Sequence, residues 1–368
     1  MVVFGTQDIL MLFSYRLEDH MDAHGGLRRA PNQFGFKTGV STESAIGKVL
    51  SIAAQVATIP RKKSLCILVT LDVRNVFNSL GCPVIDAALR GIDTPEYLVE
   101  MLRSWLTDRT LLIGEELAAR QVTCGVSQGS VLGPALWNVT YDSLLKMNTS
   151  SVVQLVGFAD DLAVVGMAVT GQQFEKAINP TLTAIDNWMR SRGLELSHQK
   201  SEAVILSRRR VFVPPRLTIG GHLIPLRNEI GYLGVILDKR LTFAAHAITV
   251  VTKAARSAAA LSRHNIGGPA QWKRRLLASV VESQLLDATP VWIPAIVEVA
   301  RTRSILIRPQ RSAALRVIRS YRTVSDEAAL VLACMLPANL LGHLRERTSD
   351  PDCVLQRSPA NNDFPRRL

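Results

Sequence analysis

The chain has 368 residues, 47% of them hydrophobic, and a formal charge of +12 from 43 lysines and arginines against 31 aspartates and glutamates. Its length allows a sizeable core and two or three subdomains. The positive charge favours a polyanionic partner, either nucleic acid or an anionic membrane surface. No apolar stretch approaches the roughly 20 residues that a membrane-spanning helix needs, and the first residues lack the basic region of a secretory signal. The five scattered cysteines include no Cys-x-x-Cys pair, which argues against a disulfide framework and favours a reducing compartment.

The N-terminal part contains a single predicted helix. The pattern is irregular at first, and the segment 33–42 then has the glycines and hydroxyl side chains of a loop. Ser41 or Thr42 could cap a helix through 44–50. After a basic turn at 61–63, the continuous apolar run 65–71 is typical of a strand covered on both faces, and it ends at Asp72.

Residues 81–120 are predicted to be mostly helical. A Gly-rich loop at 125–134 follows, and a helix comes after it. The buried face of that helix would carry Leu136, Val139, Tyr141, Leu144 and Leu145.

Two apolar runs, 155–159 and 162–167, are separated only by Asp160 and Asp161. Hydrophobic strands joined by so short a turn form a hairpin, here with two adjacent carboxylates at its tip. Adjacent anions repel each other and lose solvation, and Mg²⁺ would offset that cost because it prefers hard oxygen ligands. An isolated Asp-Asp pair is more often a solvated turn, so the interpretation depends on a third carboxylate elsewhere.

Beyond the hairpin, the apolar spacing in 182–189 predicts an amphipathic helix, with Pro180 in its first turn and Gly193 at its end. Lys200 precedes a strand at 203–206.

Three further strand segments follow. The runs 217–219 and 222–224 flank Gly220-Gly221, which is a strong hairpin signal, and 232–237 reads as one more strand. Residues 65–240 therefore alternate strands and helices, as an α+β sheet-and-helix layer would.

From about residue 241 the pattern is helical and basic. Any single basic residue there is more often part of a solvated helix face, but the accumulation favours non-specific phosphate contacts. The segment 358–367 has the composition of a disordered tail. The basic residues are Lys253, Arg256, Arg263, Lys273, Arg274, Arg275, Arg301, Arg303, Arg308, Arg311, Arg316, Arg319 and Arg322.

Asp72, at the end of a buried strand, supplies the third carboxylate. One strand-end aspartate and a hairpin-tip pair are what a two-metal phosphoryl-transfer site needs, with two cations about 3.5–4 Å apart that activate the attacking oxygen and stabilise the leaving one.

Five motifs that include these carboxylates occur in order along the chain. Together they resemble the palm motifs of a reverse transcriptase from a non-LTR (LINE-type) retrotransposon, and Gln33-Phe34-Gly35-Phe36 resembles the fingers motif that precedes them. The five are Leu71-Asp72-Val73-Arg74-Asn75-Val76-Phe77-Asn78, Gly125-Val126-Ser127-Gln128-Gly129-Ser130, Phe158-Ala159-Asp160-Asp161, Gly193-Leu194-Glu195-Leu196 with Lys200, and Tyr232-Leu233-Gly234.

The resemblance is strongest to the arthropod Jockey-like and ribosomal-DNA-inserting group, in which a downstream Tyr-Arg-Thr-Val-Ser segment, here Tyr321 to Ser325, also recurs. It covers the chain from about Arg16 to Arg347. Each motif alone is weak evidence, whereas five in order and at the right spacing are strong.

The resemblance implies an α+β, right-hand polymerase fold. Partial fingers would occupy 1–64, and the palm, with its antiparallel sheet, 65–240, with a finger-like helical insert at about 81–120. A basic helical thumb would occupy 241–325, and 326–368 would be a C-terminal extension with a disordered tail.

The resemblance also implies roles for particular residues. Asp72 and Asp160 would bridge two Mg²⁺ ions, with Mn²⁺ as an alternative, Asp161 would assist, and the carbonyl of Val73 would complete one coordination shell. Lys200 would lie near the triphosphate and could protonate the pyrophosphate leaving group.

Further roles concern the nucleotide and the primer. Phe77 would lie under the sugar and exclude a 2′-hydroxyl, which a bulky ring does by a direct clash. Gln128 and Gly129 would line the nucleotide pocket, where a glycine allows close backbone approach. Tyr232-Leu233-Gly234 would form the primer grip.

Simpler interpretations stand beside these. Phe77 could be an ordinary core residue, although its fixed offset from Asp72 favours the gate, and Lys200 could be a solvated lysine at the start of a strand. Asp142 is expected to be a structural partner rather than a ligand. Trp137 and Trp188 are expected to belong to the core rather than to stack on bases.

The chain departs from the family pattern in three places. The Arg-Pro-Ile segment, whose arginine helps to clamp the triphosphate, is not found in 1–15. Val76 replaces the small alanine usual before the gate residue. The endonuclease domain that normally precedes the polymerase and the Cys/His knuckle that normally follows it are missing. The chain is therefore expected to be a fragment or a truncated genomic copy.

The expected function is RNA-templated DNA synthesis, in which a primer 3′-hydroxyl attacks the α-phosphate of a dNTP. The partners would be an RNA template, a DNA primer or target DNA, and dNTPs, without a membrane, and the protein would act in the nucleus after cytoplasmic synthesis. The alternative is an inactive retroelement remnant that only binds nucleic acid. A viral RNA-dependent RNA polymerase is disfavoured by Phe77 and Ala159, and a group II intron maturase or a telomerase fits the motifs less well.

Overall fold

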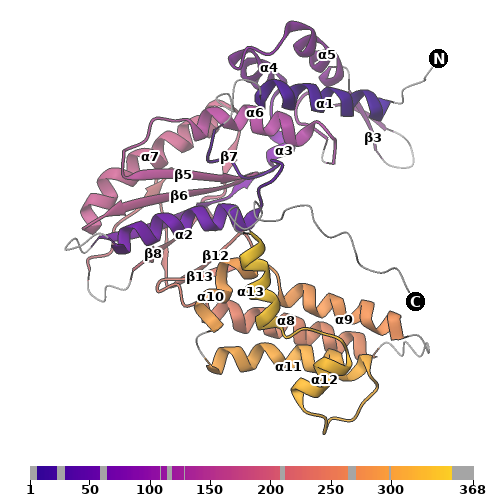
Figure 1. Ribbon diagram of the computed structural model, residues 1–368. Coiled ribbons are helices and arrows are strands. Elements are labelled where there is room, and N and C mark those ends of the chain that lie inside the picture. The colour runs from indigo at the N-terminus through magenta and orange to yellow at the C-terminus, as the bar shows by residue number, and fades with distance from the viewer. Residues whose placement is uncertain are drawn as a thin grey trace, which may run out of the picture. The chain divides into compact units, whose positions relative to one another are not determined.

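The computed structural model divides the chain into two units, Met1–Leu233 and Gly234–Leu368, and each is described by itself (Figure 1). The structure describes residues 6–22, 30–58, 64–107, 109–113, 118–127, 129–207, 212–263, 271–297 and 300–349. Among these residues no helix is both long and apolar enough to cross a membrane. The predicted basic turn at 61–63, the predicted pocket residue Gln128 and the predicted disordered tail lie outside the described residues.

A five-stranded sheet with the strand order β11-β8-β1-β6-β5 forms the centre of the first unit. All neighbouring strands are antiparallel except β8 and β11, which are parallel. In the central strand β1, Leu68 lies opposite Val165 of β6 and Val204 of β8. The predicted α+β class with an antiparallel sheet is confirmed. The strands are β1 (Leu65–Leu71), β5 (Val153–Phe158), β6 (Asp161–Ala168), β8 (Glu202–Leu206) and β11 (Leu226–Arg227).

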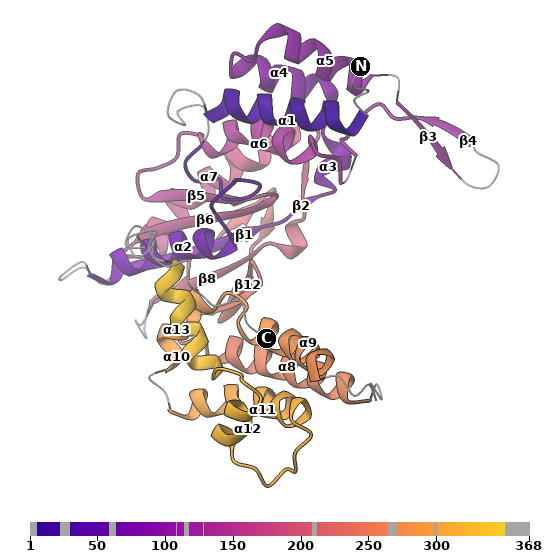
Figure 2. The same ribbon diagram turned by 45° about the vertical axis from the view of Figure 1, so that its right-hand side comes forward.

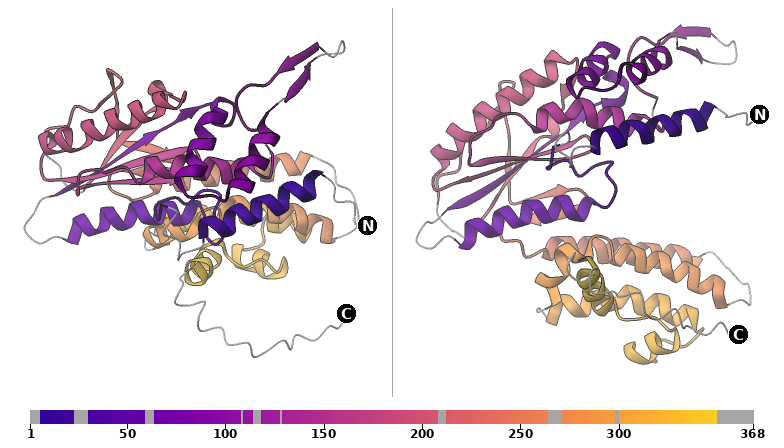
Figure 3. Two further views of the ribbon diagram at one scale, coloured as in Figure 1. Left: turned by 90° about the horizontal axis from the view of Figure 1, so that it is seen from above. Right: turned by 45° about the horizontal axis from the view of Figure 1, so that its top comes forward.

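Helices cover both faces of this sheet. Figures 1 and 3 show α7 (Gly171–Ser191) on one face and α2 (Thr42–Thr58) on the other. β1 is correspondingly buried on both faces, as its continuous apolar run predicts. Burial raises the pKa of the Cys66 thiol to about 12, so this cysteine stays neutral and packs as a small apolar residue.

Much of the remaining first unit is helical. The expectation of an irregular N-terminus is wrong, because α1 (Thr6–Asp22) buries Leu17 completely and contacts α6 (Gly133–Leu145). The helical expectation for 81–120 holds for α4 (Cys82–Gly91) and α5 (Glu96–Leu106). It is wrong for β3 (Thr110–Ile113) and β4 (Ala118–Gln121), an antiparallel pair that projects from the helices in Figure 2.

The helix α7 begins earlier than its apolar spacing suggests. A capping box opens it: the Thr170 hydroxyl accepts from the backbone N–H of Gln173, and the Gln173 side chain accepts from the N–H of Thr170. Pro180 therefore lies inside the helix rather than in its first turn, and that part of the prediction is wrong.

Short elements connect the motifs. The predicted Gly-Gly hairpin is confirmed between β9 (Thr218–Ile219) and β10 (His222–Leu223), with positive φ at both glycines. The single strand predicted over 232–237 is wrong: β12 (Glu229–Tyr232) and β13 (Val235–Asp238) are separate strands, because Leu233 and Gly234 have φ of 47° and 85°. The other short elements are β2 (Val73–Arg74), α3 (Val76–Ser79), β7 (Glu195–Leu196) and the 3₁₀ turn η1 (His198–Lys200).

The second unit is mainly helical beyond β13, as predicted from about residue 241. Trp292 and Gln310 are fully buried in it. Gln310 donates to the Leu336 carbonyl and to Glu282, and accepts from the N–H of Ala338, so its amide joins three segments. The helices are α8 (Ala244–Arg263), α9 (Gln271–Leu285), α10 (Thr289–Val297), α11 (Ala300–Val317), α12 (Asp326–Leu332) and α13 (Ala338–Ser349).

Candidate active site

The sheet brings the three predicted carboxylates to one edge. Leu71 of β1 lies opposite Leu162 of β6, so Asp72 and Asp161 are the next residues beyond that pair at the same end of both strands. Phe158 pairs with Asp161 across the β5–β6 turn, which leaves Asp160 at the tip. Strand register therefore places residues from two distant parts of the chain side by side.

The charges at this edge act on one another. Loss of hydration, followed by repulsion from the carboxylates of Asp160 and Asp72, raises the pKa of Asp161 to about 6. Asp161 is nevertheless an exposed residue, and the Asp160 side chain is partly accessible. The ammonium group of Lys200 lies 3.2 Å from a carboxylate oxygen of Asp72, so two predicted catalytic residues are in direct contact.

The carbonyl of Val73 points away from its neighbouring strand. β2 pairs with β7 so that Val73 lies opposite Leu196. The N–H of Ser197 donates to the Asp72 carbonyl at 2.8 Å, so the ladder bonds flank the Val73–Leu196 pair rather than join it. In an antiparallel ladder the N–H and C=O of such a pair point outward. The Val73 carbonyl is thus directed away from β7, as an additional oxygen ligand requires.

Within the described residues, no group of three or more His, Cys, Asp or Glu side chains is arranged to hold a metal ion by itself. The donors at this edge are nevertheless all oxygens, and their mutual repulsion is the situation that a cation relieves. Mg²⁺ is usually held by one or two carboxylates together with substrate phosphates rather than by a complete protein cage. The residues present fit an ion of this kind.

Phe77 is only partly buried, next to the carboxylate edge. Its ring contacts two other aromatic rings, with its centroid 6.2 Å from that of Phe36 and 6.3 Å from that of Trp137. Its carbonyl accepts from the N–H of Val126 at 2.7 Å, which attaches α3 to the Gly-rich loop. These two aromatic contacts restrict the movement of the ring, as a steric gate needs.

The Gly-rich loop approaches α3 closely. A side chain at Gly125 would come within 3 Å of backbone atoms of Asn78 and Phe77, so only glycine fits there. Gly129 has a φ of 85° with open space around it, which permits close approach of a ligand to the backbone.

The predicted primer grip is a backbone turn with a buried tyrosine. Tyr232 is 3% exposed, and both burial and the nearby charge of Asp161 raise the pKa of its hydroxyl. Among the described groups its hydroxyl finds no hydrogen-bond partner. Leu233 and Gly234, which are more exposed, would therefore offer the contact surface.

The sequence interpretation missed a loop that supports the carboxylate hairpin. Gly157 of β5 exchanges backbone hydrogen bonds with Asn32 and Phe34. The side-chain amide of Asn138 donates to the carbonyls of Gly35 and Phe36. An asparagine among the apolar residues of a buried helix is the sequence signal that could have revealed this support.

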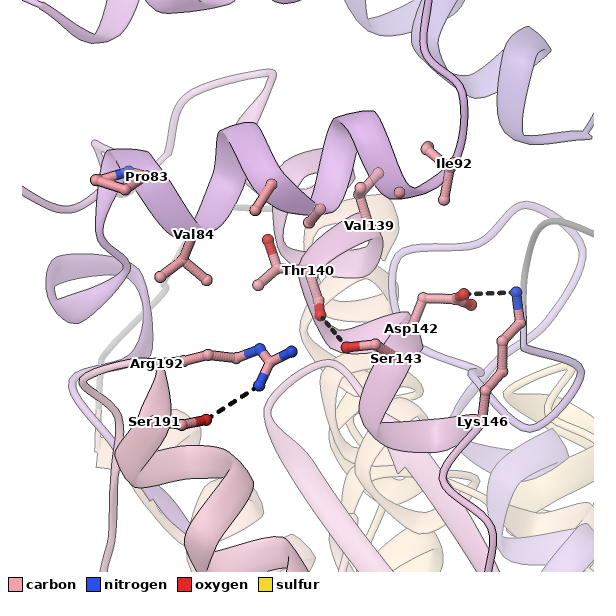
Figure 4. Close-up of a pocket in the computed structure, with 13 residues that line it drawn as sticks. Pro83, Val84, Ile92, Val139, Thr140, Asp142, Ser143, Lys146, Ser191 and Arg192 are labelled. Carbon is pink, nitrogen blue, oxygen red and sulfur yellow. Dashed lines mark hydrogen bonds and ion pairs between the residues drawn. The ribbon is translucent and has the colours of Figure 1, made fainter.

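A separate pocket of about 680 Å³ lies between α4, α6 and the end of α7 (Figure 4). In it Lys146 pairs with Asp142, whose carboxylate also accepts from the N–H of Ala30. Asp142 thus has structural partners, as expected. The guanidinium of Arg192 lies over the Trp188 ring. None of the four predicted metal ligands lines this pocket.

Several predicted phosphate-binding arginines have partners inside the second unit. Arg274 donates to the carbonyl of Val317, the last residue of α11. Arg311 donates to the carbonyls of Arg322 and Val324 and pairs with Asp326. Arg256, in contrast, is exposed on α8. Some of the predicted phosphate-binding residues therefore bond to groups within the unit, whereas Arg256 is exposed to solvent.

Residues 9–237 match the family described as reverse transcriptase (RNA-dependent DNA polymerase). The match spans more than half of the chain and contains the whole carboxylate edge. The chain belongs to this family, and the predicted resemblance is confirmed.

The similar curated proteins come from non-LTR retrotransposons. The chain is 28% identical to the probable RNA-directed DNA polymerase from transposon X-element of Drosophila melanogaster, over 66% of this chain and 26% of that protein. It is 26% identical to the RNA-directed DNA polymerase from mobile element jockey of the same species, over 61% of this chain and 25% of that protein. A Pol polyprotein from retrotransposable element R1 of Nasonia vitripennis is 27% identical over 59% of this chain and 66% of that protein. The chain thus spans about a quarter of the first two relatives.

Among solved structures, the chain is similar to apo telomerase from Candida tropicalis, with a TM-score of 0.47 and 11% identity over 93% of this chain and 58% of that chain. It is also similar to telomerase from Candida albicans in complex with a fragment of telomeric RNA, with a TM-score of 0.46 and 12% identity over 88% of this chain and 56% of that chain.

Proposed function

We propose that this chain is the polymerase part of a non-LTR retrotransposon reverse transcriptase and that it extends a primer 3′-hydroxyl with dNTPs on an RNA template. The observation that carries the proposal is the shared edge of the sheet, where strand register joins Asp72 to the Asp160-Asp161 hairpin. Membership of the reverse transcriptase family supports the same reaction.

Asp72, Asp160, Asp161 and the Val73 carbonyl would hold two Mg²⁺ ions, with Mn²⁺ as an alternative. When bound, such ions lower the pKa of the attacking hydroxyl and neutralise charge on the phosphates. The raised pKa of Asp161 supports this assignment, because a carboxylate crowded by two others gains most from a neighbouring cation.

Lys200 would contribute after the bond is made. Its ammonium group already lies at the carboxylate edge, 3.2 Å from Asp72, and its side chain is 71% exposed. An exposed cation there could turn from Asp72 toward the pyrophosphate and give it a proton. Phe77, which contacts the rings of Phe36 and Trp137, would reject a ribose 2′-hydroxyl by steric clash.

The remaining assignments follow the family arrangement. Gln128 and Gly129 would line the nucleotide pocket, and Tyr232-Leu233-Gly234 would contact the primer. The segments 1–64, 65–240 and 241–325 would serve as fingers, palm and thumb, with RNA template and DNA primer or target as partners. Reverse transcription at a chromosomal target would take place in the nucleus.

Primer extension on poly(rA)/oligo(dT) with Mg²⁺ tests the proposal. The wild-type chain should incorporate dTTP and discriminate against UTP. The Phe77→Val variant should retain incorporation of dTTP but lose discrimination by about 10-fold or more, because the clash with the 2′-hydroxyl is removed. Leu111, an exposed residue of β3, offers a control: Leu111→Val should change neither rate.

Two results would count against the proposal. Absence of dTTP incorporation, together with salt-sensitive RNA binding, would leave the inactive nucleic-acid-binding remnant as the better description. Equal incorporation of dTTP and UTP by the wild-type chain would instead indicate an RNA polymerase.

A further inference from the structure

The turn that carries Asp160 is fixed at two points by residues far away in the chain. Ala159 opens the turn with a φ of 55°, a conformation that residues with a side chain rarely adopt. A side chain at Gly35 would come within 1.9 Å of the Ala159 nitrogen, so the two backbones are in direct contact. The indole N–H of Trp137 donates to the Ala159 carbonyl at 2.8 Å.

The indole bond acts on the catalytic hairpin through one peptide plane. The carbonyl of Ala159 belongs to the same planar peptide group as the nitrogen of Asp160. Trp137 is fully buried and Ala159 is 8% exposed, so water cannot easily replace the indole donor. Loss of the donor would leave a buried carbonyl unpaired and free the peptide that leads into Asp160 to rotate.

The Trp137 side chain also contacts Phe77, the proposed sugar gate. The ring of Trp137 lies 6.3 Å from that of Phe77 at an angle of 50°. Phe36 contacts Phe77 with its own ring. The loop that carries Phe36 is bonded to Asn138, the residue after Trp137. One stretch of α6 therefore contacts the hairpin, the gate and the loop beside the gate.

We propose that Trp137 is a positioning residue that couples the Asp160-Asp161 hairpin to Phe77, the proposed sugar gate. Its N–H orients the peptide leading into Asp160, and its ring supports Phe77 against the incoming sugar. This inference rests on the proposed polymerase function and assigns a role in it to a residue that the sequence pattern places simply in the core.

Trp188 provides a matched control. It is 9% exposed, and its indole N–H donates to the Ser143 hydroxyl at 3.2 Å. Its ring contacts Tyr141, as that of Trp137 does. Trp188 therefore has the same chemistry and comparable burial. Its ring, however, contacts the guanidinium of Arg192, which lines the pocket of Figure 4, and its indole N–H does not bond to the hairpin.

The test compares Trp137→Phe, Trp137→Leu and Trp188→Phe in RNA-templated primer extension, with kcat and KM measured separately for dTTP and UTP. Trp137→Phe keeps a ring but loses the donor, so kcat should fall about 10-fold or more while discrimination between the nucleotides is kept. Trp137→Leu should lower discrimination as well. Trp188→Phe should stay within about twofold of wild type in both quantities, although it loses an indole bond of the same kind.

A second measurement does not depend on turnover. The chain has five tryptophans, so ¹⁵N-indole labelling gives five resonances, which Trp→Phe variants assign. Addition of dTTP with Mg²⁺ to the chain bound to primer-template should shift the Trp137 resonance and leave that of Trp188 in place. If Trp137→Phe does not fold, its resonance is the one left after the other four have been assigned.

The primer-extension kinetics and the indole resonances together distinguish a failure of this inference from a failure of the proposed function. A wild-type chain that does not extend a primer refutes the polymerase, and the resonance comparison then decides the coupling alone. An equal loss of kcat in Trp137→Phe and Trp188→Phe, or a Trp137 resonance that does not respond to nucleotide, would overturn the inference.

Discussion

The carboxylate edge of the first unit and the arginine-rich helices of the second use charge in opposite ways. At the edge, three acidic side chains meet, and the pKa of Asp161 rises to about 6. In the helices, Arg274 and Arg311 direct their charge at carbonyl groups inside the unit. Charged groups that have partners within the molecule stabilise the fold. Like charges that repel one another indicate a binding site for an oppositely charged ligand. Residue counts alone cannot distinguish the two cases.

The largest expected effect is that of Asp160→Asn. The variant should lose primer extension by about 1,000-fold or more, because the carboxylate that we propose as a metal ligand becomes a neutral amide. Its midpoint of urea unfolding should be unchanged or higher than that of the wild type, since the substitution removes a charge that repels Asp161. A substantial loss of stability would show that the edge is balanced internally after all.

Arg311→Ala, unlike Asp160→Asn, should lower the free energy of unfolding. The side chain is 26% exposed and donates to the Arg322 and Val324 carbonyls at 2.6 and 2.7 Å, so its loss should cost about 1.5–3 kcal/mol of unfolding free energy. The matched control is Arg256→Ala on the exposed side of α8, which should change stability by less than about 0.5 kcal/mol.

RNA binding completes this second comparison. If Arg256 contacts phosphate, its variant should bind RNA more weakly and with a salt dependence lower by about one ion. Arg311→Ala should keep the salt dependence of the wild type under conditions in which it is folded. The reverse assignment, with Arg311 governing the salt dependence, would break the distinction between internal and external charge.

A smaller effect is expected for the pH dependence of stability. The folded-state pKa of Asp161, about 6, lies above its ordinary value of 3.8, so the folded chain binds this proton more tightly than the unfolded chain does. This carboxyl should therefore make stability decrease as pH rises from about 4 to about 6. The contribution should be modest because Asp161 is exposed and solvent screens it.

The pH effect can be isolated by difference. The urea midpoint of Asp161→Asn relative to wild type should rise across that pH interval, since other titrating groups contribute equally to both. A constant difference from pH 4 to pH 7 would mean that loss of hydration and repulsion from Asp160 and Asp72 do not raise the pKa of Asp161 in solution.

The smallest effect is expected for Tyr232→Phe. The hydroxyl is buried without a partner among the described groups, so its removal should be neutral or stabilise the chain by up to about 1 kcal/mol. Thermal unfolding measures this directly. A loss of more than about 1 kcal/mol would indicate that the hydroxyl bonds to a group such as an ordered water.

The sequence predicted those features that depend on local patterns. Residue periodicity and turn chemistry predicted the β5–β6 hairpin, the Gly220-Gly221 turn and the buried strand β1. Lys200 contacts Asp72, and its place near the triphosphate stays a prediction.

Other features escaped prediction for identifiable reasons. The start of α7 was missed because Pro180 resembled a helix start, although the capping box at Thr170 was readable. The break at Leu233 was hidden because a non-glycine residue adopts a positive φ there. The bonds of Trp137 and Asn138 to the hairpin and its supporting loop join segments more than 20 residues apart, which no local pattern encodes.

The position of β1 also bears on how the chain is made. This strand, apolar except for Thr70, is the middle strand of the sheet, yet its partners β6 and β8 follow it by about 90 and 130 residues. At ribosomal speeds of about 5–20 residues per second, it remains without both partners for many seconds. An unpaired apolar strand is a template for aggregation. Fragments that end before Glu202 should therefore accumulate as insoluble protein, and synthesis in the cell should depend on chaperones until β8 has emerged.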